Sequence, residues 1–486
     1  MNIKRRAIKL QPDPSRVLIR PSIPDDPQRI ISIIGRALTL SDERVDWLLS
    51  DIMHEFAERH FNIERVLDRH FENVRPHLFT DTQLSRARQL LIGALFTSEF
   101  ALESGALFNP SIVAHPDQSN LPDGALRFIL SLRATGQEHL SSIQFRSGVI
   151  DRDLNITLDV ASQHVAAPQV TPSATFDKTM FVLKLREMGF ENGLAREVLG
   201  PMPMTFTLAD LQKNIVAART KSRSRSLDEE RALDCMRWLA EMNCEVSFSE
   251  NQPLSERIIF PSFADESSGI GDARFVRFSD KADENGRAIY YATCTAYNGR
   301  VILPQLIETR DFLRFKIVTL NGPAAQSRSS ALFPRRIGGR FAMLSRQDDE
   351  NLFIAFSENI HFWHDTQKLL KPSQAWEFIH LGSCGSPIET ERGWLLLTHG
   401  VGAMRKYCIG AILLDLENPA RVIARLREPL LRPDQNEREG CAPNVVYTCG
   451  ALLHDRELII PYAMSDYASS IATVALDELL ERLKPE

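Results

Sequence analysis

The stretch from Gly269 to Phe278 places an acid and a base two residues apart, where a loop meets an apolar run. The apolar run is typical of a strand that enters a core. Asp272 therefore lies at a loop–strand junction, a common position for a reactive carboxylate on a rigid scaffold. Residues two apart in an extended chain share a face, so Arg274 is placed to orient Asp272 or to bind the same ligand. An ordinary turn or cap residue is the alternative for Asp272.

Three further polar stretches lie beside apolar segments later in the chain. They contain Arg328 with Arg346, Glu389 with His399, and Glu437 followed by Asp466. Carboxylates gathered in one pocket suit glycoside chemistry, which needs a proton donor and either a base or an incoming anion. Arginines suit phosphate or sugar hydroxyls. Surface charges and structural salt bridges remain the alternative for the whole set.

The composition is that of a globular protein and does not indicate binding to nucleic acid or to an anionic membrane. The 486 residues carry a net charge of −6, so no basic field points to nucleic acid or to an anionic membrane. The seven cysteines include no CxxC pair, which is typical of a reducing compartment. We find neither a secretion signal nor an apolar run of about 18 residues, and expect a cytoplasmic protein. The spacing of His54, His60 and His70 matches no zinc signature, so we expect no metal.

Five pairs of short apolar segments recur along the chain and predict β-hairpins. The pairs are 126–132 with 142–145, 288–294 with 301–306, 341–344 with 352–356, 394–398 with 409–414, and 458–462 with 471–476. The last four begin at intervals of roughly 50–65 residues, close to the length of one propeller blade. A β-sandwich also has many short strands, but not this period. The loops at one end of a propeller converge, which would gather the polar stretches around one pocket.

Two other regions have helical periodicity. Apolar residues repeat at three and four between residues 41 and 101 and again between 178 and 243. Five prolines between residues 12 and 27 break regular structure and predict an arm over residues 1–35. We therefore divide the chain into an N-terminal arm and helical region (1–100), the first part of the β region (101–160), a linker with a helical insertion (161–250) and the rest of the β region (251–486).

Several motifs resemble glycoside hydrolase family 130, which contains β-mannoside phosphorylases and β-1,2-mannosidases. The resemblance runs from about residue 108 to the end, apart from the insertion. Its carriers are the stretch 385–401, with Gly-Trp-Leu-Leu-Leu-Thr-His-Gly-Val, the stretch 415–423, and Glu-Arg-Glu-Gly at 437–440 followed by Pro-Asn-Val-Val at 443–446. The resemblance implies a mainly β fold, a five-bladed β-propeller, here with an N-terminal helical region and a helical insertion.

The resemblance also implies roles for single residues. Asp272 takes the position of the general acid, although the family's Glu-Asp-Pro-Arg reads Gly-Asp-Ala-Arg here. Asn109, Arg133, His399 and Asp466 match positions that line the sugar pocket. We count Arg274 and Glu437 as further substrate-binding candidates, and Glu437 or Glu439 could also share the role of a base. Arg328 and Arg346 match two phosphate-binding positions. A third phosphate position is a lysine in the phosphorylases, and we align it with Glu389.

This last difference favours hydrolysis over phosphorolysis. A carboxylate repels phosphate by roughly 4 kcal/mol at about 4 Å, and it suits the base of an inverting hydrolase. Our first hypothesis is an inverting β-mannosidase, acting on β-1,2-linked manno-oligosaccharides, with Asp272 as acid and Glu389 as leading base. The alternatives are a β-mannoside phosphorylase that uses inorganic phosphate and forms mannose 1-phosphate, and a non-catalytic carbohydrate-binding propeller. We expect no other cofactor, and leave open a homo-oligomer formed through the helical regions.

Overall fold

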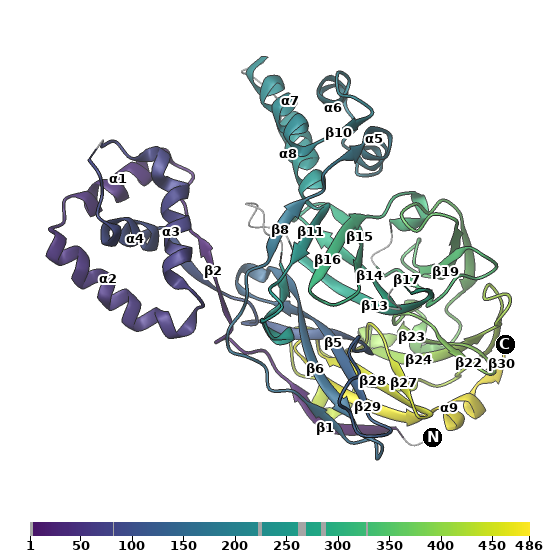
Figure 1. Cartoon of the computed structure of the whole chain (residues 1–486). Coiled ribbons are helices and arrows are strands. Elements are labelled where there is room, and N and C mark those ends of the chain that lie inside the picture. The colour runs from purple at the N-terminus through teal and green to yellow at the C-terminus, as the bar shows by residue number, and fades with distance from the viewer. Residues whose placement is uncertain (1–2, 81, 222–225, 261–268, 283–287, 327–328) are drawn as a thin grey trace.

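A computed structural model describes residues 3–80, 82–221, 226–260, 269–282, 288–326 and 329–486. The larger part of these residues forms antiparallel β-sheets, and two groups of helices project from them (Figure 1). Five of the sheets have four to six strands each. The mainly β class predicted from the sequence is therefore confirmed.

All five predicted hairpins are antiparallel strand pairs. They are β5 (Leu126–Thr135) with β6 (Ser141–Ile150), β14 (Ala288–Tyr297) with β15 (Ile302–Thr309), β18 (Phe341–Ser345) with β19 (Leu352–Ser357), β23 (Gly393–Val401) with β24 (Tyr407–Leu414), and β28 (Glu457–Met464) with β29 (Ala468–Ala475). Each hairpin lies in a different sheet. Strand β23 is buried at every residue, because both of its faces pack against other parts of the chain.

Further strands complete the five sheets. β4 (Ala106–Ala114), β7 (Ile156–Leu158) and β12 (Ile258–Ile259) join the first hairpin, and β13 (Gly269–Ala282) and β16 (Arg314–Thr319) join the second. β17 (Ala331–Leu332) and β20 (Thr366–Leu370) flank the third, and β21 (His380–Ser383), β22 (Ile388–Thr390), β25 (Val422–Arg425) and β30 (Lys484–Pro485) belong to the fourth. The fifth contains β26 (Val446–Tyr447), β27 (Leu452–His454) and, from the N-terminal arm, β1 (Lys4–Leu10).

The two ends of the chain meet in the fifth sheet. Strand β1 pairs antiparallel with β29, so an N-terminal strand extends a sheet built from the C-terminal region. Helix α9 (Leu476–Arg482) follows β29, and β30 then pairs with β25 of the preceding sheet. The predicted arm thus lies on the β region, held by backbone hydrogen bonds rather than by side chains alone.

The N-terminal helices form a separate lobe (Figure 1). Helices α1 (Pro27–Leu38), α2 (Asp42–Phe56), α3 (Ile63–Val74) and α4 (Arg86–Leu95) lie between β2 (Val17–Pro21) and β3 (Thr97–Ala101), which pair with each other. The prediction that residues 1–35 lack regular helix was wrong at Pro27. Proline is well suited to the first position of a helix, where its missing N–H is not needed, and Asp26 caps that helix.

The lobe is tied to the first sheet through a buried ionic cluster. The carboxylate of Glu103 accepts hydrogen bonds from Arg16 Nε at 2.8 Å and from Arg146 Nη2 at 2.7 Å. All three side chains are buried. Each charge therefore depends on its partners, because water cannot replace a lost ion pair there.

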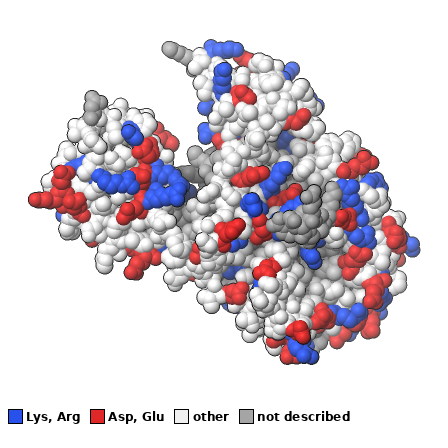
Figure 2. All heavy atoms as spheres, in the orientation of Figure 1, with Lys and Arg blue, Asp and Glu red and all other residues white. Residues whose placement is uncertain are grey.

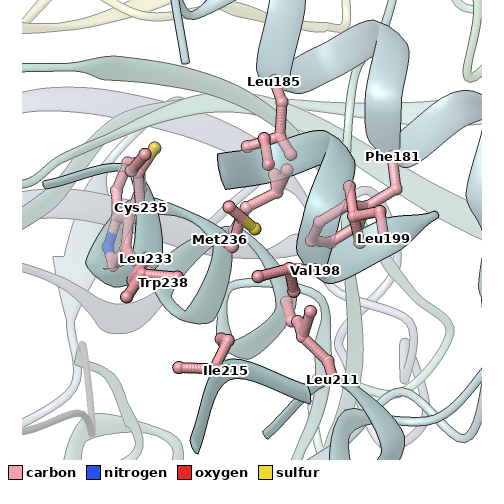
Figure 3. Close-up of a cluster of buried hydrophobic side chains, with 14 of the residues drawn as sticks. Phe181, Leu185, Val198, Leu199, Leu211, Ile215, Leu233, Cys235, Met236 and Trp238 are labelled. Atoms are coloured by element: carbon pink, nitrogen blue, oxygen red, sulfur yellow. The ribbon is translucent and has the colours of Figure 1, made fainter. Parts of the chain in front are cut away.

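The predicted helical insertion is connected to the edge of the second sheet. Strands β8 (Gln169–Pro172) and β11 (Cys244–Ser247) pair with each other, and β11 also pairs with β16. Between them lie α5 (Lys178–Glu187), α6 (Gly193–Leu199), α7 (Leu208–Lys221) and α8 (Leu227–Glu241), with the short strands β9 (Phe176–Asp177) and β10 (Thr205–Phe206). The helices share an apolar core that includes Leu185, Leu211 and Met236 (Figure 3). This core continues to Ala296 and Leu303 of the sheet.

Acidic and basic side chains are interspersed over the face shown in Figure 2, without a large area of one sign. Among the described residues, no helix is both long and apolar enough to span a bilayer.

Candidate active site

A cavity of about 530 Å³ lies where residues from all five sheets meet. Its lining contains Asn109 of β4, Asp272 of β13, Arg346 directly after β18, His399 of β23 and Asp466 between β28 and β29. The other lining residues are Ser329, Arg405, Tyr407, Ala442, Pro443, Val445 and Tyr447. The structure thus brings together five of the residues that the sequence singled out, although up to 357 positions of the chain separate them.

Asp272 is held in the cavity by an irregularity in its strand. The register of β13 against β14 shifts between Gly271 and Arg274, and Asp272 has a positive φ of 59°. Asn109 occupies a similar irregularity in β4 and has a φ of 49°. A bulge of this kind re-aims a side chain, and it is common next to active sites. The Asn109 Nδ2 donates a hydrogen bond of 2.6 Å to the Asp272 Oδ1.

Arg133 completes the surroundings of this carboxylate. Its Nη1 lies 3.4 Å from both oxygens of Asp272, while its Nε donates to the Ser141 hydroxyl at 3.0 Å. Glycine is required at position 271 for this approach, since a Cβ there would lie only 2.7 Å from the Arg133 Cδ. Arg133 therefore binds the carboxylate of Asp272, but it is not among the residues that line the cavity, and its predicted contact with the substrate stays a prediction.

Burial and neighbouring groups act in opposite directions on the pKa of Asp272. Burial raises the pKa, but the charge of Arg133 and the hydrogen bond from Asn109 together outweigh it and leave the pKa below its usual value. The unliganded site therefore holds Asp272 as a carboxylate at neutral pH. A sugar that replaced water around Asp272 would strengthen the burial effect and so raise the pKa.

Asp466 has the opposite balance. Burial, followed by the nearby charge of Asp272, raises its pKa from the usual 3.8 to about 6. No hydrogen-bond donor from the described residues lowers the pKa of Asp466 again. The charge of Arg133 lowers it, but this is the smallest of the three contributions. The two carboxylates of the cavity thus differ in proton affinity, and such differences are typical of functional sites.

Arg274 lies behind the cavity and holds three segments of the chain. Its Nη1 donates to the backbone oxygens of Ser329 and Ser383 at 2.9 and 3.1 Å, and its Nη2 donates to the hydroxyl of Tyr447. The side chain is 2% exposed. The prediction placed Arg274 on the face of Asp272, either to orient that carboxylate or to bind the same ligand, whereas the structure shows a buried guanidinium whose hydrogen bonds position the cavity wall.

Other residues of the cavity lining are cationic and aromatic. Arg346 lines the cavity, and His399 packs against Tyr407 and Tyr447 with ring centroids 6.1 and 5.1 Å apart. Burial, then the charge of Arg346, lowers the pKa of His399 far below its usual value, so the imidazole is neutral. Its Nδ1 is buried and has no hydrogen-bond partner among the described residues. An unpaired buried polar atom beside a cavity is available to a polar ligand.

Glu389, the predicted base, is not among the residues that line the cavity. Its carboxylate is 46% exposed and forms two hydrogen bonds with Arg335, of 2.7 and 2.9 Å. It pairs with Trp394 at one end of β23, five residues before His399, which corresponds to about 16 Å of strand. The structure therefore does not place Glu389 in the cavity as a base. A carboxylate outside the cavity also does not repel a phosphate bound inside it, so the argument that favoured hydrolysis no longer applies.

Glu437 is also absent from the cavity lining. Its carboxylate accepts hydrogen bonds from the Arg5 Nε at 2.9 Å and from the Tyr462 hydroxyl at 2.6 Å. It therefore anchors the N-terminal strand to the fifth sheet and does not face a substrate. Arg328 lies outside the described residues, so its predicted phosphate contact stays a prediction.

Four polar lining residues were missed by the sequence reasoning, namely Ser329, Arg405, Tyr407 and Tyr447. Tyr447 lies directly after the Pro-Asn-Val-Val motif, and Ser329 lies between the predicted Arg328 and the strand β17, so both were within reach of the motif argument. Arg405 lies in the loop that joins β23 to β24, and Tyr407 is the first residue of β24; no motif marks either residue.

Known proteins with a similar sequence are carbohydrate-active enzymes. The sequence model of glycoside hydrolase family 130, described as beta-1,4-mannooligosaccharide phosphorylase, matches residues 242–485. The chain is 34% identical to a 1,2-beta-oligomannan phosphorylase of Thermoanaerobacter sp. (strain X514) over 222 residues, 44% of this chain and 71% of that protein. It is 29% identical over 221 residues to a beta-1,2-mannobiose phosphorylase of the same strain, 44% of this chain and 69% of that protein.

A solved structure, the beta-1,2-mannobiose phosphorylase of Listeria innocua in complex with beta-1,2-mannobiose, covers 79% of this chain and 92% of its own at 21% identity, with a TM-score of 0.46. The family model and the relative at 34% identity define a class of carbohydrate-active enzymes. The chain belongs to glycoside hydrolase family 130. The family predicted from the motifs is thereby confirmed, and with it the prediction of an enzyme.

Proposed function

We propose that this chain is an inverting β-mannoside phosphorylase. An oxygen of inorganic phosphate bonds to C1 of the terminal mannose as the bond from C1 to the glycosidic oxygen breaks. The leaving oxygen takes up a proton that reaches it from Asp272, and the products are α-mannose 1-phosphate and a shortened saccharide. Attack from the face opposite the leaving group accounts for the inversion.

The observation that carries this proposal is that one cavity is lined both by carboxylates and by cationic or neutral hydrogen-bonding groups. Asp272 and Asp466 provide the carboxylates, and a leaving oxygen needs a proton from such a group. Arg346 and the neutral His399 provide the positive charge and hydrogen bonds that an attacking phosphate needs. The unpaired atoms His399 Nδ1 and Asn109 Oδ1 are free to bind polar groups of the substrates.

Hydrolysis is supported less well than it was by the sequence. The hydrolase hypothesis required Glu389 as a base beside the sugar, and Glu389 instead pairs with Arg335 outside the cavity. The two Thermoanaerobacter relatives, 34% and 29% identical to this chain, are named as phosphorylases, which also supports the use of inorganic phosphate. Phosphorolysis, first considered as the alternative, is therefore our conclusion.

We further propose β-1,2-linked mannosides as the substrates. The match with this chain spans more than two thirds of two relatives, and both are named for β-1,2-linked substrates. A Ruminococcus albus relative named for β-1,4-mannooligosaccharides is 32% identical, but over 170 residues and 51% of that protein. The two linkages are therefore to be compared directly in the assay.

The scaffold that we propose is a five-bladed β-propeller. Five antiparallel sheets each contain one predicted hairpin, and each sheet contributes a residue to the same cavity. The pairing of β1 with β29 joins the ends of the chain within one sheet, as closure of a ring requires.

The test is cleavage of β-1,2- and β-1,4-mannobiose with and without inorganic phosphate. We expect turnover that depends on phosphate and yields mannose 1-phosphate, detected by ³¹P NMR. Equal release of free mannose in the absence of phosphate would contradict the proposal and favour a hydrolase.

Asp272→Asn tests the catalytic role itself. We expect turnover to fall by about 10²–10⁴-fold, the usual contribution of acid catalysis, while the protein stays folded by circular dichroism. Mannobiose binding without turnover in the unaltered protein would instead support a non-catalytic carbohydrate-binding propeller.

A further inference from the structure

The loop between β23 and β24 carries a cationic side chain to the cavity. Residues 402–406 form this loop, and Arg405 lines the cavity beside Arg346, His399 and Tyr407. Its neighbours in sequence, Met404 and Lys406, are not part of the lining. The loop therefore singles out one side chain for the site.

The conformation of the loop is unusual and well held. Met404 and Arg405 both have positive φ, 58° and 50°, a region that side chains of this size rarely adopt. The Gly402 N–H donates to the Lys406 oxygen at 3.1 Å and closes the loop. A Cβ at Gly402 would lie 2.9 Å from the Trp376 Cα, so the loop packs closely on the preceding segment. Arg405 is thus presented by a defined backbone.

Arg405 and Arg346 act on the same part of the site. His380 packs against His399 and Tyr407, with ring centroids 5.7 and 5.6 Å apart. Burial lowers the pKa of His380 to about 4, and the charges of Arg346 and Arg405 both add to this effect. Within the part of the chain that the structure describes, no carboxylate forms an ion pair with Arg405, in contrast to Arg335 with Glu389.

Two guanidinium groups that line one cavity repel each other. Asp349 pairs with Arg346 at 3.5 Å, but its side chain is 93% exposed, so it offsets this repulsion only weakly. A manno-oligosaccharide is neutral and does not relieve the repulsion. An inorganic phosphate does, because it is an anion whose oxygens accept paired hydrogen bonds from a planar guanidinium. The two arginines therefore suit phosphate better than they suit the departing sugar.

We propose that Arg405 binds the attacking phosphate together with Arg346 and so sets the affinity of the enzyme for phosphate. The inference rests on the proposed phosphorolysis and adds a phosphate ligand to the two arginines that the family resemblance implies. Arg405 comes from a loop outside the motifs that carry the resemblance. Proteins of this family with a different residue at this position are expected to bind phosphate less tightly.

The test compares Arg405→Gln with Lys406→Gln, which removes the same charge from the next residue of the same loop. The apparent KM for inorganic phosphate is measured at saturating concentration of the mannobiose that the unaltered enzyme cleaves. We expect Arg405→Gln to raise the phosphate KM about tenfold, as for loss of one charge-assisted hydrogen bond, with the mannobiose KM changed less than about twofold. Lys406→Gln is expected to change the phosphate KM less than about twofold.

Arg405→Lys keeps the charge without the planar guanidinium, and we expect an intermediate phosphate KM. If Arg405→Gln matches Lys406→Gln while phosphate still drives cleavage, the inference is wrong and the proposed function stands. A rise of the mannobiose KM with an unchanged phosphate KM would assign Arg405 to the sugar and also overturn it. If the unaltered enzyme does not use phosphate, both proposals fall.

Discussion

Replacement of Asp466 by Asn should stabilise the folded protein at neutral pH. Burial and the charge of Asp272 raise the pKa of the Asp466 carboxyl from 3.8 to about 6, so its ionised form is unfavourable in the native state. The amide of Asn has nearly the same shape and carries no charge. Asn also tolerates the positive φ of 49° at this position.

The size of the effect follows from the pKa. Each pKa unit corresponds to about 1.4 kcal/mol, so the rise to about 6 destabilises the native state by up to about 3 kcal/mol above pH 6. The native state binds the proton more tightly than the unfolded chain does. Stability is therefore lost as the pH rises from about 4 to 6, and the advantage of Asp466→Asn should grow over the same window and vanish below about pH 4.

The assay is urea denaturation at pH 4 and pH 7.5, followed by tryptophan fluorescence. Asp455→Asn is the matched control, because Asp455 also lies in a turn between strands with a positive φ, of 42°, but its side chain is 64% exposed. The control should change the free energy of unfolding by less than about 0.5 kcal/mol at either pH. We also expect Asp466→Asn to lose turnover, since stability and activity often oppose each other at functional sites.

An equal gain at both pH values would refute the reasoning, because it would show that the effect is not due to ionisation. No gain at pH 7.5 would show that Asp466 is not a destabilised carboxylate in the native protein.

Three further predictions concern residues outside the cavity lining. Glu389→Gln should change turnover less than about twofold and stability by no more than about 1 kcal/mol, because its pair with Arg335 is exposed; kinetics and urea denaturation check this. Glu103→Gln should destabilise the protein by about 3–5 kcal/mol, because it leaves Arg16 and Arg146 buried without their counter-charge. Arg274→Lys should lower the melting temperature and turnover together, since one ammonium cannot bridge the same three segments.

Different results would contradict these statements. A loss of turnover above tenfold in Glu389→Gln, with stability unchanged, would restore Glu389 as a functional residue. A Glu103→Gln protein as stable as its parent would show that the cluster is hydrated or rearranges. An Arg274→Lys protein with normal stability but altered substrate KM would assign Arg274 to ligand binding after all.

Much of the fold followed from local patterns. The apolar alternation that predicts a hairpin at 394–398 and 409–414 arises because a strand presents its side chains alternately to two sides, and such a pattern is readable without knowledge of the partners. Helices of the insertion were readable for the same reason, since their apolar residues recur at three and four. The helix at Pro27 was missed because a proline ends a helix in one position and begins it in another.

The sequence likewise predicted some residues of the site correctly and one of them wrongly. Asp272, Asn109, His399, Arg346 and Asp466 stand in or next to recognisable motifs, and the cavity contains all of them. Glu389 stands in a motif too, yet its strand β22 pairs at the far end of β23, where it meets Arg335. Position in a motif therefore indicated which segments approach the cavity, but not which end of a segment reaches it.

The sequence by itself determined the family, the strand pairs and the presence of an acid beside the second group of strands, because these depend on residue type and short-range spacing. The tertiary structure alone decided which charges share a cavity. Whether the pKa of a carboxylate is raised, as that of Asp466 is, or an arginine lines a cavity, as Arg405 does, depends on burial and on neighbours far away in the chain. These quantities arise only when five sheets meet at one point, and no local pattern records them.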